Sequence, residues 1–145
     1  MKRDAFNKMI DEKVKAVQAG EVAARGDILF EIGYRVISRT PVASGNARSQ
    51  WNAGLERNDT NTNNAIDPTG QDAVNRLQAV IARIGSTQTR FFFTNALPYA
   101  QRLENGWSDQ APAGMVQVTL AEFPQIAREK LYARTGGKGG ALSKV

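Results

Sequence analysis

The chain has 145 residues, of which 41% are hydrophobic and 23% charged, and its formal net charge is +5. This length and composition suit one compact domain with a modest core. The sequence has neither cysteine nor histidine, which excludes a disulfide framework, a thiolate zinc site, a cysteine nucleophile and any histidine-dependent triad. We therefore expect a protein that is not an enzyme and that needs no cofactor or metal ion.

The first residues do not have the pattern of a targeting segment. Lys2 and Arg3 are followed by mixed charged and apolar residues, whereas a signal peptide continues with an unbroken apolar run. No stretch approaches the ~20 apolar residues of a membrane-spanning helix. The sequence predicts a soluble protein that is made in a cytoplasm and has no membrane partner.

Two helical patterns precede residue 40. In the first, apolar residues recur every three or four positions: Phe6, Ile10, Val14 and Val17. This spacing predicts a helix over 4–19. A similar pattern covers 21–38, so Gly20 either separates two helices or lies inside one long helix. Gly26 and Gly33 share a helix face and would allow close approach of another backbone, within the chain or from another subunit.

A stop and a strand follow. Pro41 disfavours helix in the residue before it, and residues 44–46 form a Ser-Gly-Asn turn. The residues after this turn predict a strand over 48–55. Trp51 and Leu55 are expected to point into the packed side of the sheet.

The middle of the chain alternates polar and apolar segments. Residues 58–69, which are rich in Asn, Thr and Asp, are too polar to pack and predict a flexible loop. Helical spacing returns over 72–84, with Asp72 as its cap and Gly85 as its stop. The three phenylalanines at 91–93 predict a short strand.

The last predicted elements are helical. Pro98 suits the first position of a short helix, because its fixed φ fits there and its missing N–H is not needed. Gly106 is expected to end this helix. A final helix is predicted over 116–133, and Pro124 implies a kink or break near Phe123.

The positive charge is concentrated at the C-terminus. We expect residues 1–133 to form a single folded domain and residues 134–145 to be a flexible, basic, glycine-rich tail. The basic residues of this tail are candidates for contact with nucleic-acid phosphates or with an acidic partner: Arg134, Lys138 and Lys144. A solvated terminus without a partner is the alternative.

Residues 94–115 combine a proline-initiated helix, a glycine stop, a tryptophan and a second Pro/Gly loop. Such a rigid segment lowers the entropic cost of binding a partner, so we predict a contact surface. Trp107 either anchors this surface or covers the core. The expected interface residues are Pro98, Tyr99, Arg102, Glu104, Trp107, Ser108, Gln110, Pro112 and Met115.

Other chemistry is weakly indicated. Glu104 and Asp109 form a carboxylate pair that a glycosidase could use, but a polar surface explains them better. The Gly-rich stretch 136–140 lacks the spacing of a phosphate-binding loop. Arg90 beside residues 91–93 resembles a base-stacking platform, although alternate phenylalanines are expected to pack into the core.

Two blocks carry a family resemblance. Residues 40–51 read TPVASGNARSQW, close to the pattern Thr-Pro-x-x-(Ser/Thr)-Gly-(Asn/x)-Leu-Arg with Ala47 in the place of leucine. Residues 95–106 read NALPYAQRLENG and match Asn-x-x-Pro-Tyr-Ala-x-x-Leu-Glu-x-Gly throughout. Over about 21–132, the chain thus resembles the neck and tail-completion proteins of long-tailed bacteriophages.

The resemblance implies an α+β fold in which a long N-terminal helix packs on a small, mostly antiparallel sheet, with a middle and a C-terminal helix. It implies a structural virion protein, assembled in the bacterial cytoplasm, that forms a ring of six copies at the head–tail junction. The ring would bind head connector or adaptor proteins above it and the tail terminator or tail tube protein below. It would join the tail to the DNA-filled head and continue the DNA channel, with basic residues facing passing phosphates.

Ring contacts are heterologous, and we expect 98–115 to supply one patch and the long helix, or the arm that precedes it, part of the other. A tail terminator that caps the tail tube is the near alternative. A small nucleic-acid-binding protein, which would bind DNA with a strong salt dependence, is a further one.

Overall fold

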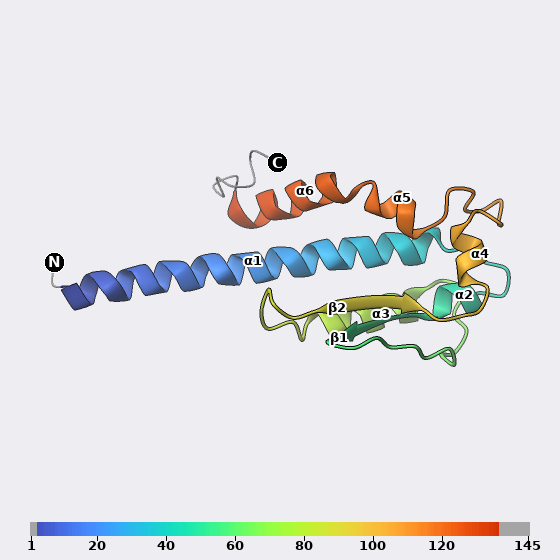
Figure 1. Cartoon of the computed structure of the whole chain (residues 1–145), viewed down its shortest axis with the longest axis horizontal. Helices are drawn as coiled ribbons and strands as arrows, with labels where there is room; N and C mark the ends of the chain where they lie inside the picture. Colours follow the sequence, from blue (N-terminus) through green and yellow to red (C-terminus); the bar gives the residue numbers. More distant parts are fainter. Residues whose placement is uncertain (1–2, 137–145) are drawn as a thin grey trace.

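The computed structural model describes residues 3–136. Within this range the elements are α1 (Arg3–Arg39), α2 (Asn46–Ser49), β1 (Trp51–Leu55), α3 (Gln71–Ile81), β2 (Phe91–Asn95), α4 (Ala100–Glu104), α5 (Val116–Leu120) and α6 (Phe123–Thr135). α5 and α6 lie against one side of α1, and α3 and the sheet lie on the other (Figure 1). The fold is α+β, with the long N-terminal helix, antiparallel strands, and middle and C-terminal helices that were predicted.

α1 is one continuous helix of 37 residues. A glycine inside a helix costs only about 1 kcal/mol relative to alanine, so Gly20 does not interrupt it. The helix ends before Thr40, which Pro41 holds out of the α conformation. The Thr40 hydroxyl is buried and accepts a hydrogen bond from the Trp51 indole N–H at 2.8 Å. Among the described residues, no helix combines the length and the apolar run needed to cross a bilayer.

α1 and α3 cross closely at two glycines of α1. A Cβ at Gly33 would lie 2.5 Å from Leu77 Cδ2, and one at Gly26 would lie 3.2 Å from Ile81 Cγ2. Leu77 is only 1% exposed, so it has no free space into which it could move. The close approach expected at these glycines is therefore a contact within the chain.

The sheet has two antiparallel strands, with Trp51 opposite Asn95 and Leu55 opposite Phe91. Trp51 is buried and stacks on Phe93 at 4.9 Å between ring centroids. Phe91 and Phe93 pack against the core from the same face of β2, which agrees with the expected alternation. Leu55, at the end of β1, is only half-buried.

The strand predicted over 48–55 is shorter in the structure, because its first residues form α2. Gly45 adopts φ +93°, a left-handed conformation that starts this helical turn. Arg48 consequently lies outside the sheet. Its guanidinium donates to the carbonyl oxygens of Ser38 and Thr40, each at 3.0 Å, and so satisfies acceptors at the end of α1.

The polar segment 58–69 contains no helix or strand and folds back on β1 through side-chain hydrogen bonds. Asn64 donates to Asn52 Oδ1 at 2.9 Å, and the Asn64 backbone exchanges bonds with the Gln50 amide at 2.8 and 2.9 Å. Asn52 also donates to the Asn61 carbonyl oxygen at 2.8 Å. Gln50 and Asn52 are almost fully buried, so the asparagines of the loop satisfy polar groups that would otherwise lack partners.

The helix predicted over 72–84 is α3, and the structure differs at both ends. Asp72 is not its cap. Gly70, with φ +77°, occupies that position, and the Asp67 carboxylate accepts the Asp72 backbone N–H at 2.9 Å. After α3 the Arg83 N–H donates a hydrogen bond to the carbonyl oxygen of Val80, three residues earlier. The chain therefore forms a tighter turn before Gly85, the expected stop.

The C-terminal helical region divides as Pro124 predicted. α5 and α6 are separated at Ala121 and Glu122, and Pro124 lies in the first turn of α6, where its missing N–H is not required. Pro98, in contrast, lies in the turn before α4 and not in the helix itself.

α6 continues two residues past the expected domain boundary, through Thr135, and ends at Gly136 with φ +61°. Arg134 therefore belongs to a helix and not to a tail. Its guanidinium pairs with the Asp27 carboxylate of α1 at 2.6 Å. The other basic candidates of the predicted tail lie outside the described residues: Lys138 and Lys144.

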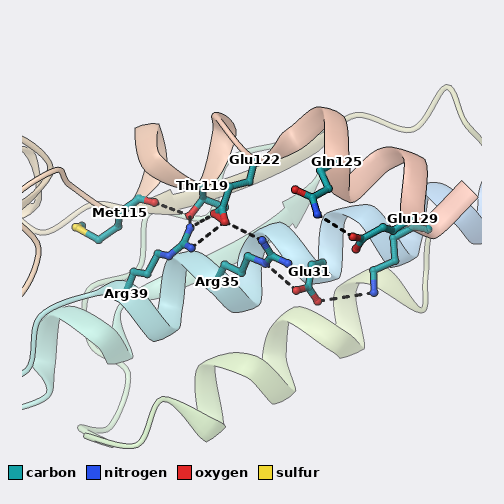
Figure 2. Close-up of polar contacts among 9 residues, drawn as sticks. Glu31, Arg35, Arg39, Met115, Thr119, Glu122, Gln125 and Glu129 are labelled. Atoms are coloured by element: carbon teal, nitrogen blue, oxygen red, sulfur yellow. Dashed lines mark hydrogen bonds and ion pairs between the residues drawn. The ribbon is translucent and has the colours of Figure 1, made fainter. Parts of the chain in front are cut away.

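Ion pairs and hydrogen bonds help to dock α5 and α6 on α1 (Figure 2). The Glu122 carboxylate binds both Arg35, at 2.9 Å, and Arg39. Arg39 also donates to the hydroxyl of Thr119 at 2.8 Å. Glu31 pairs with Arg35 one turn away at 2.7 Å. Ion pairs thus hold α6 along the part of α1 that follows Asp27.

Candidate interaction surface

Glu104 organises the 98–115 segment. Its carboxylate accepts hydrogen bonds from the backbone N–H groups of Met115 (3.0 Å), Val116 (2.8 Å) and Gln117 (2.9 Å). Donors at the start of a helix have no partner within it. Desolvation by burial favours a raised pKa, but the three N–H groups together outweigh it and hold the pKa of Glu104 below its ordinary value of 4.5. Glu104 therefore ties the end of α4 to the start of α5.

Two glycines close the loop between α4 and α5. Gly106 has φ +86° and Gly114 has φ +81°, a region that side chains rarely adopt. A Cβ at Gly106 would collide with the carbonyl oxygen of Pro112, and one at Gly114 would collide with that of Glu104. The loop is therefore compact, and its conformation depends on glycine at both positions.

Most of the expected interface residues lie on the surface of this frame. The exposed members are Pro98, Tyr99, Arg102, Trp107, Gln110 and Pro112, and Ser108 is half-buried. Trp107 is 72% exposed, the highest value among the large hydrophobic residues of the described chain. The Arg102 guanidinium lies 5.3 Å from the centroid of its ring, a cation–π arrangement. Trp107 does not cover the core, and its role as an interface anchor stays a prediction.

Met115 and Glu104 differ from the expectation. Met115 is 1% exposed and belongs to the core cluster, so its side chain is not on the surface. Glu104 is half-buried, and its carboxylate is occupied by backbone N–H groups. Both residues support the surface from within.

The two sequence blocks of the family resemblance meet in space, which the sequence analysis did not predict. The Gln110 side-chain amide exchanges two hydrogen bonds with the Val42 backbone, at 2.8 and 3.0 Å. Asn46 donates to the Tyr99 hydroxyl at 3.3 Å. Between the two blocks lies a cleft of about 150 Å³, to which Pro41 contributes. The candidate surface therefore includes part of residues 41–47.

The carboxylate pair considered for catalysis is not arranged for that purpose. Glu104 is fully engaged in hydrogen bonds, whereas Asp109 is exposed and makes none within the described chain. No group of three or more His, Cys, Asp or Glu residues in the described range could hold a metal ion.

The basic-aromatic platform at 90–93 has a different role in the fold. Arg90 pairs with Glu56 at 3.2 Å, and Phe91 and Phe93 pack against the core. Neither aromatic ring is free to stack on a nucleic-acid base.

A second exposed apolar surface lies on the N-terminal part of α1, the element that was expected to supply part of a ring patch. The part of α1 before residue 20 projects beyond the rest of the molecule (Figure 1). The apolar residues that share one face of this part are exposed: Phe6 49%, Ile10 41%, Val14 49% and Val17 61%. Their spacing was visible in the sequence, but spacing alone does not tell whether the same chain covers them.

No protein-family model, no curated protein and no solved structure matches this chain. The resemblance to phage neck proteins therefore stays a prediction from its two sequence blocks.

Proposed function

We propose that this chain is a structural virion protein that forms a ring at the head–tail junction of a long-tailed bacteriophage. The ring joins the tail to the DNA-filled head and continues the DNA channel. Its partners are other copies of the chain, expected to number six, the head connector or adaptor proteins above, and the tail terminator or tail tube protein below. The chain acts by binding and not by catalysis.

The observation that carries this proposal is the rigid, exposed surface around Trp107. Aromatic residues and arginines are the side chains that most often dominate binding energy at interfaces. Here Arg102 and Trp107 are stacked and exposed on a frame held by Glu104 and two left-handed glycines. Such a surface loses little conformational entropy when it binds.

A second observation supports a bridging role. The Trp107 surface lies near α4, at one end of the long axis, and the exposed apolar part of α1 lies at the other end (Figure 1). A protein that links two neighbours needs separate surfaces. Two exposed patches at opposite ends meet this requirement.

The test is electron microscopy of lysates from infections in which the chain is not made. We expect DNA-filled or leaking heads beside separate tails of normal length. Overlong tails would instead favour the alternative, a terminator that caps the tail tube. Normal joined and infectious particles would refute an assembly role.

A nucleic-acid-binding role is supported less well. Arg134, one of its three candidate residues, is engaged by Asp27. Arg90 is paired with Glu56, and Phe91 and Phe93 pack against the core. If assembly is normal without the chain, DNA binding at several salt concentrations is the next measurement, because phosphate contacts give a steep salt dependence.

A further inference from the structure

We propose that the N-terminal arm of α1 in one copy of the chain docks into a groove on α1 of the next copy. We define the arm as residues 3–17 and its apolar stripe as Phe6, Ile10, Val14 and Val17. The inference rests on the ring assembly proposed above, and it names the two surfaces that form the contact between subunits.

The arm has no apolar partner within the described chain. Its stripe residues are between 41% and 61% exposed, although they lie on one helix face. Helices in proteins are stabilised mainly by packing an amphipathic face. This face of the arm is therefore expected to pack against something outside the subunit.

The receiving groove lies along α1, between α3 and α6. It has a volume of about 560 Å³, and its floor is formed by small residues of α1, including Ala23 and Gly26. Phe30, Ile81 and Ile84 supply apolar walls. Polar residues line the groove as well: Gln78, Lys130 and the ion pair of Asp27 with Arg134. The groove adjoins a second hollow of about 610 Å³ between α1 and the 85–88 loop, which shares Ala23 with it. The small side chain of Ala23 allows another helix to approach closely, whereas Gly26 already packs close to Ile81.

The stripe and the groove have matching lengths. The stripe, from Phe6 to Val17, extends about 17 Å along the helix axis. The α1 residues that line the two hollows run from Gln18 to Phe30 and extend about 18 Å. An amphipathic helix laid into a groove with apolar walls is a common mode of recognition.

The arm that docks in this groove belongs to a second copy. The arm and the groove are successive parts of one continuous helix, α1, so the arm cannot fold back onto its own groove. Gly26 follows Val17 by nine residues, which is two and a half turns, so the two surfaces face opposite sides of α1. A contact between different patches is heterologous and repeats from copy to copy, forming a ring where the rotation closes.

Paired cysteines test the contact directly, because the chain has no cysteine of its own. Val14→Cys places a thiol on the stripe, and Gln78→Cys places one on the exposed rim of the groove. We expect the double variant, treated with a short bis-maleimide, to give a ladder of cross-linked oligomers. Val14→Cys with Asn63→Cys, an exposed position in the 58–69 loop, is the control and should give no ladder beyond dimers.

A second measurement uses sedimentation of the full chain. Ile10→Gln with Val17→Gln removes apolar stripe contacts and should weaken self-association about a hundred-fold. Asp11→Gln with Lys15→Gln alters the polar side of the same arm and should leave self-association unchanged. Circular dichroism checks that both variants remain folded.

The outcomes separate this inference from the proposed function. Oligomers that form normally but do not cross-link through Val14 and Gln78 would overturn the arm–groove contact and leave the ring assembly standing. A chain that stays monomeric over about a hundred-fold range of concentration would overturn both.

Discussion

At the scale of single residues, one carboxylate determines the conformation of the candidate surface. Glu104 holds three backbone N–H groups of the α5 start, and the glycines at 106 and 114 leave room for the loop that returns to it. A hydrogen bond to a charged group contributes about 1.5–3 kcal/mol. The side chain that resembles a catalytic acid is therefore structural.

Glu104→Gln should lower the free energy of unfolding by about 1–2 kcal/mol. The glutamine side chain has the same size as that of glutamate, but it has no charge and its NH₂ group is a donor that faces other N–H groups. Urea denaturation at neutral pH measures this change. Asp109→Asn removes an exposed carboxylate from the same loop and is the matched control, with an expected change below about 0.5 kcal/mol. Equal stability of the two variants would show that the Glu104 bonds contribute nothing.

Trp107→Ala should separate stability from function. Because the ring is 72% exposed, its loss should change the unfolding free energy by no more than about 0.5–1 kcal/mol. Head–tail joining, scored in an infection that depends on the variant, should fall sharply. Ile66→Ala, at a residue that is 56% exposed, is the control. Full joining by Trp107→Ala would show that this side chain is not an anchor.

At the scale of elements, α1 is held differently on its two sides. Toward α3 the contact is close and apolar, with Gly33 against Leu77. Toward α6 it includes ion pairs, with Glu122 between Arg35 and Arg39, and Asp27 with Arg134. The two sides should therefore respond to different perturbations.

Gly33→Ala tests the apolar side. Alanine adds about 1 kcal/mol of helix propensity, but the new methyl group would meet Leu77 in a filled core, and overpacking costs about 1–3 kcal/mol. We expect a net loss of up to about 2 kcal/mol in urea denaturation. Gly20→Ala, with nothing within 4 Å of its Cβ, should instead gain up to about 1 kcal/mol. A gain at both positions would mean that the crossing tolerates the extra methyl group.

Acid tests the ionic side. The hydrogen bond from Arg39, followed by the charges of Arg39 and Arg35, holds the pKa of Glu122 below its ordinary 4.5 against the opposing effect of burial. The Glu122 carboxylate therefore binds a proton more readily in the unfolded chain than in the folded one. Its contribution to stability is complete above the unfolded-state pKa. This contribution is lost as the pH falls through the lower folded-state pKa. The hydrogen bond from Arg134 lowers the pKa of Asp27 in the same direction.

Melting temperature should therefore fall as the solution is acidified below about pH 5, and Glu122→Gln should show a shallower fall than the unmodified chain. Glu21→Gln, which changes an exposed glutamate of α1, should follow the unmodified chain. Identical acid profiles for Glu122→Gln and Glu21→Gln would remove Glu122 as a source of the pH dependence.

At the scale of the whole molecule, the folded body and the arm are separable. Deleting residues 3–17 removes exposed helix and no apolar contact of the body. The free energy of unfolding should therefore change by less than about 1 kcal/mol, and the melting temperature should stay within a few degrees. Self-association should be lost. A large drop in melting temperature would show that the arm stabilises its own subunit.

Much of this architecture was predictable because its causes are local. Pro41 and Pro124 mark helix boundaries through steric exclusion that involves only neighbouring residues, and the spacing of apolar residues determines which residues share a helix face. Gly26 and Gly33 indicated a close crossing for the same reason. The absence of cysteine and histidine restricted the possible chemistry before any fold was known.

The remaining features depend on contacts between residues distant in the chain, and only the tertiary structure decided them. Even near the start of α3 a turn decides the cap, because it brings the Asp67 carboxylate, and not that of Asp72, to an N–H group of the first turn. Arg134 lies 107 positions from Asp27 in sequence and still pairs with it. The apolar spacing of α1 is similar on both sides of Gly20, yet α3 and α6 cover only the later part. Spacing determines which residues share a face, and the rest of the fold determines whether that face is covered.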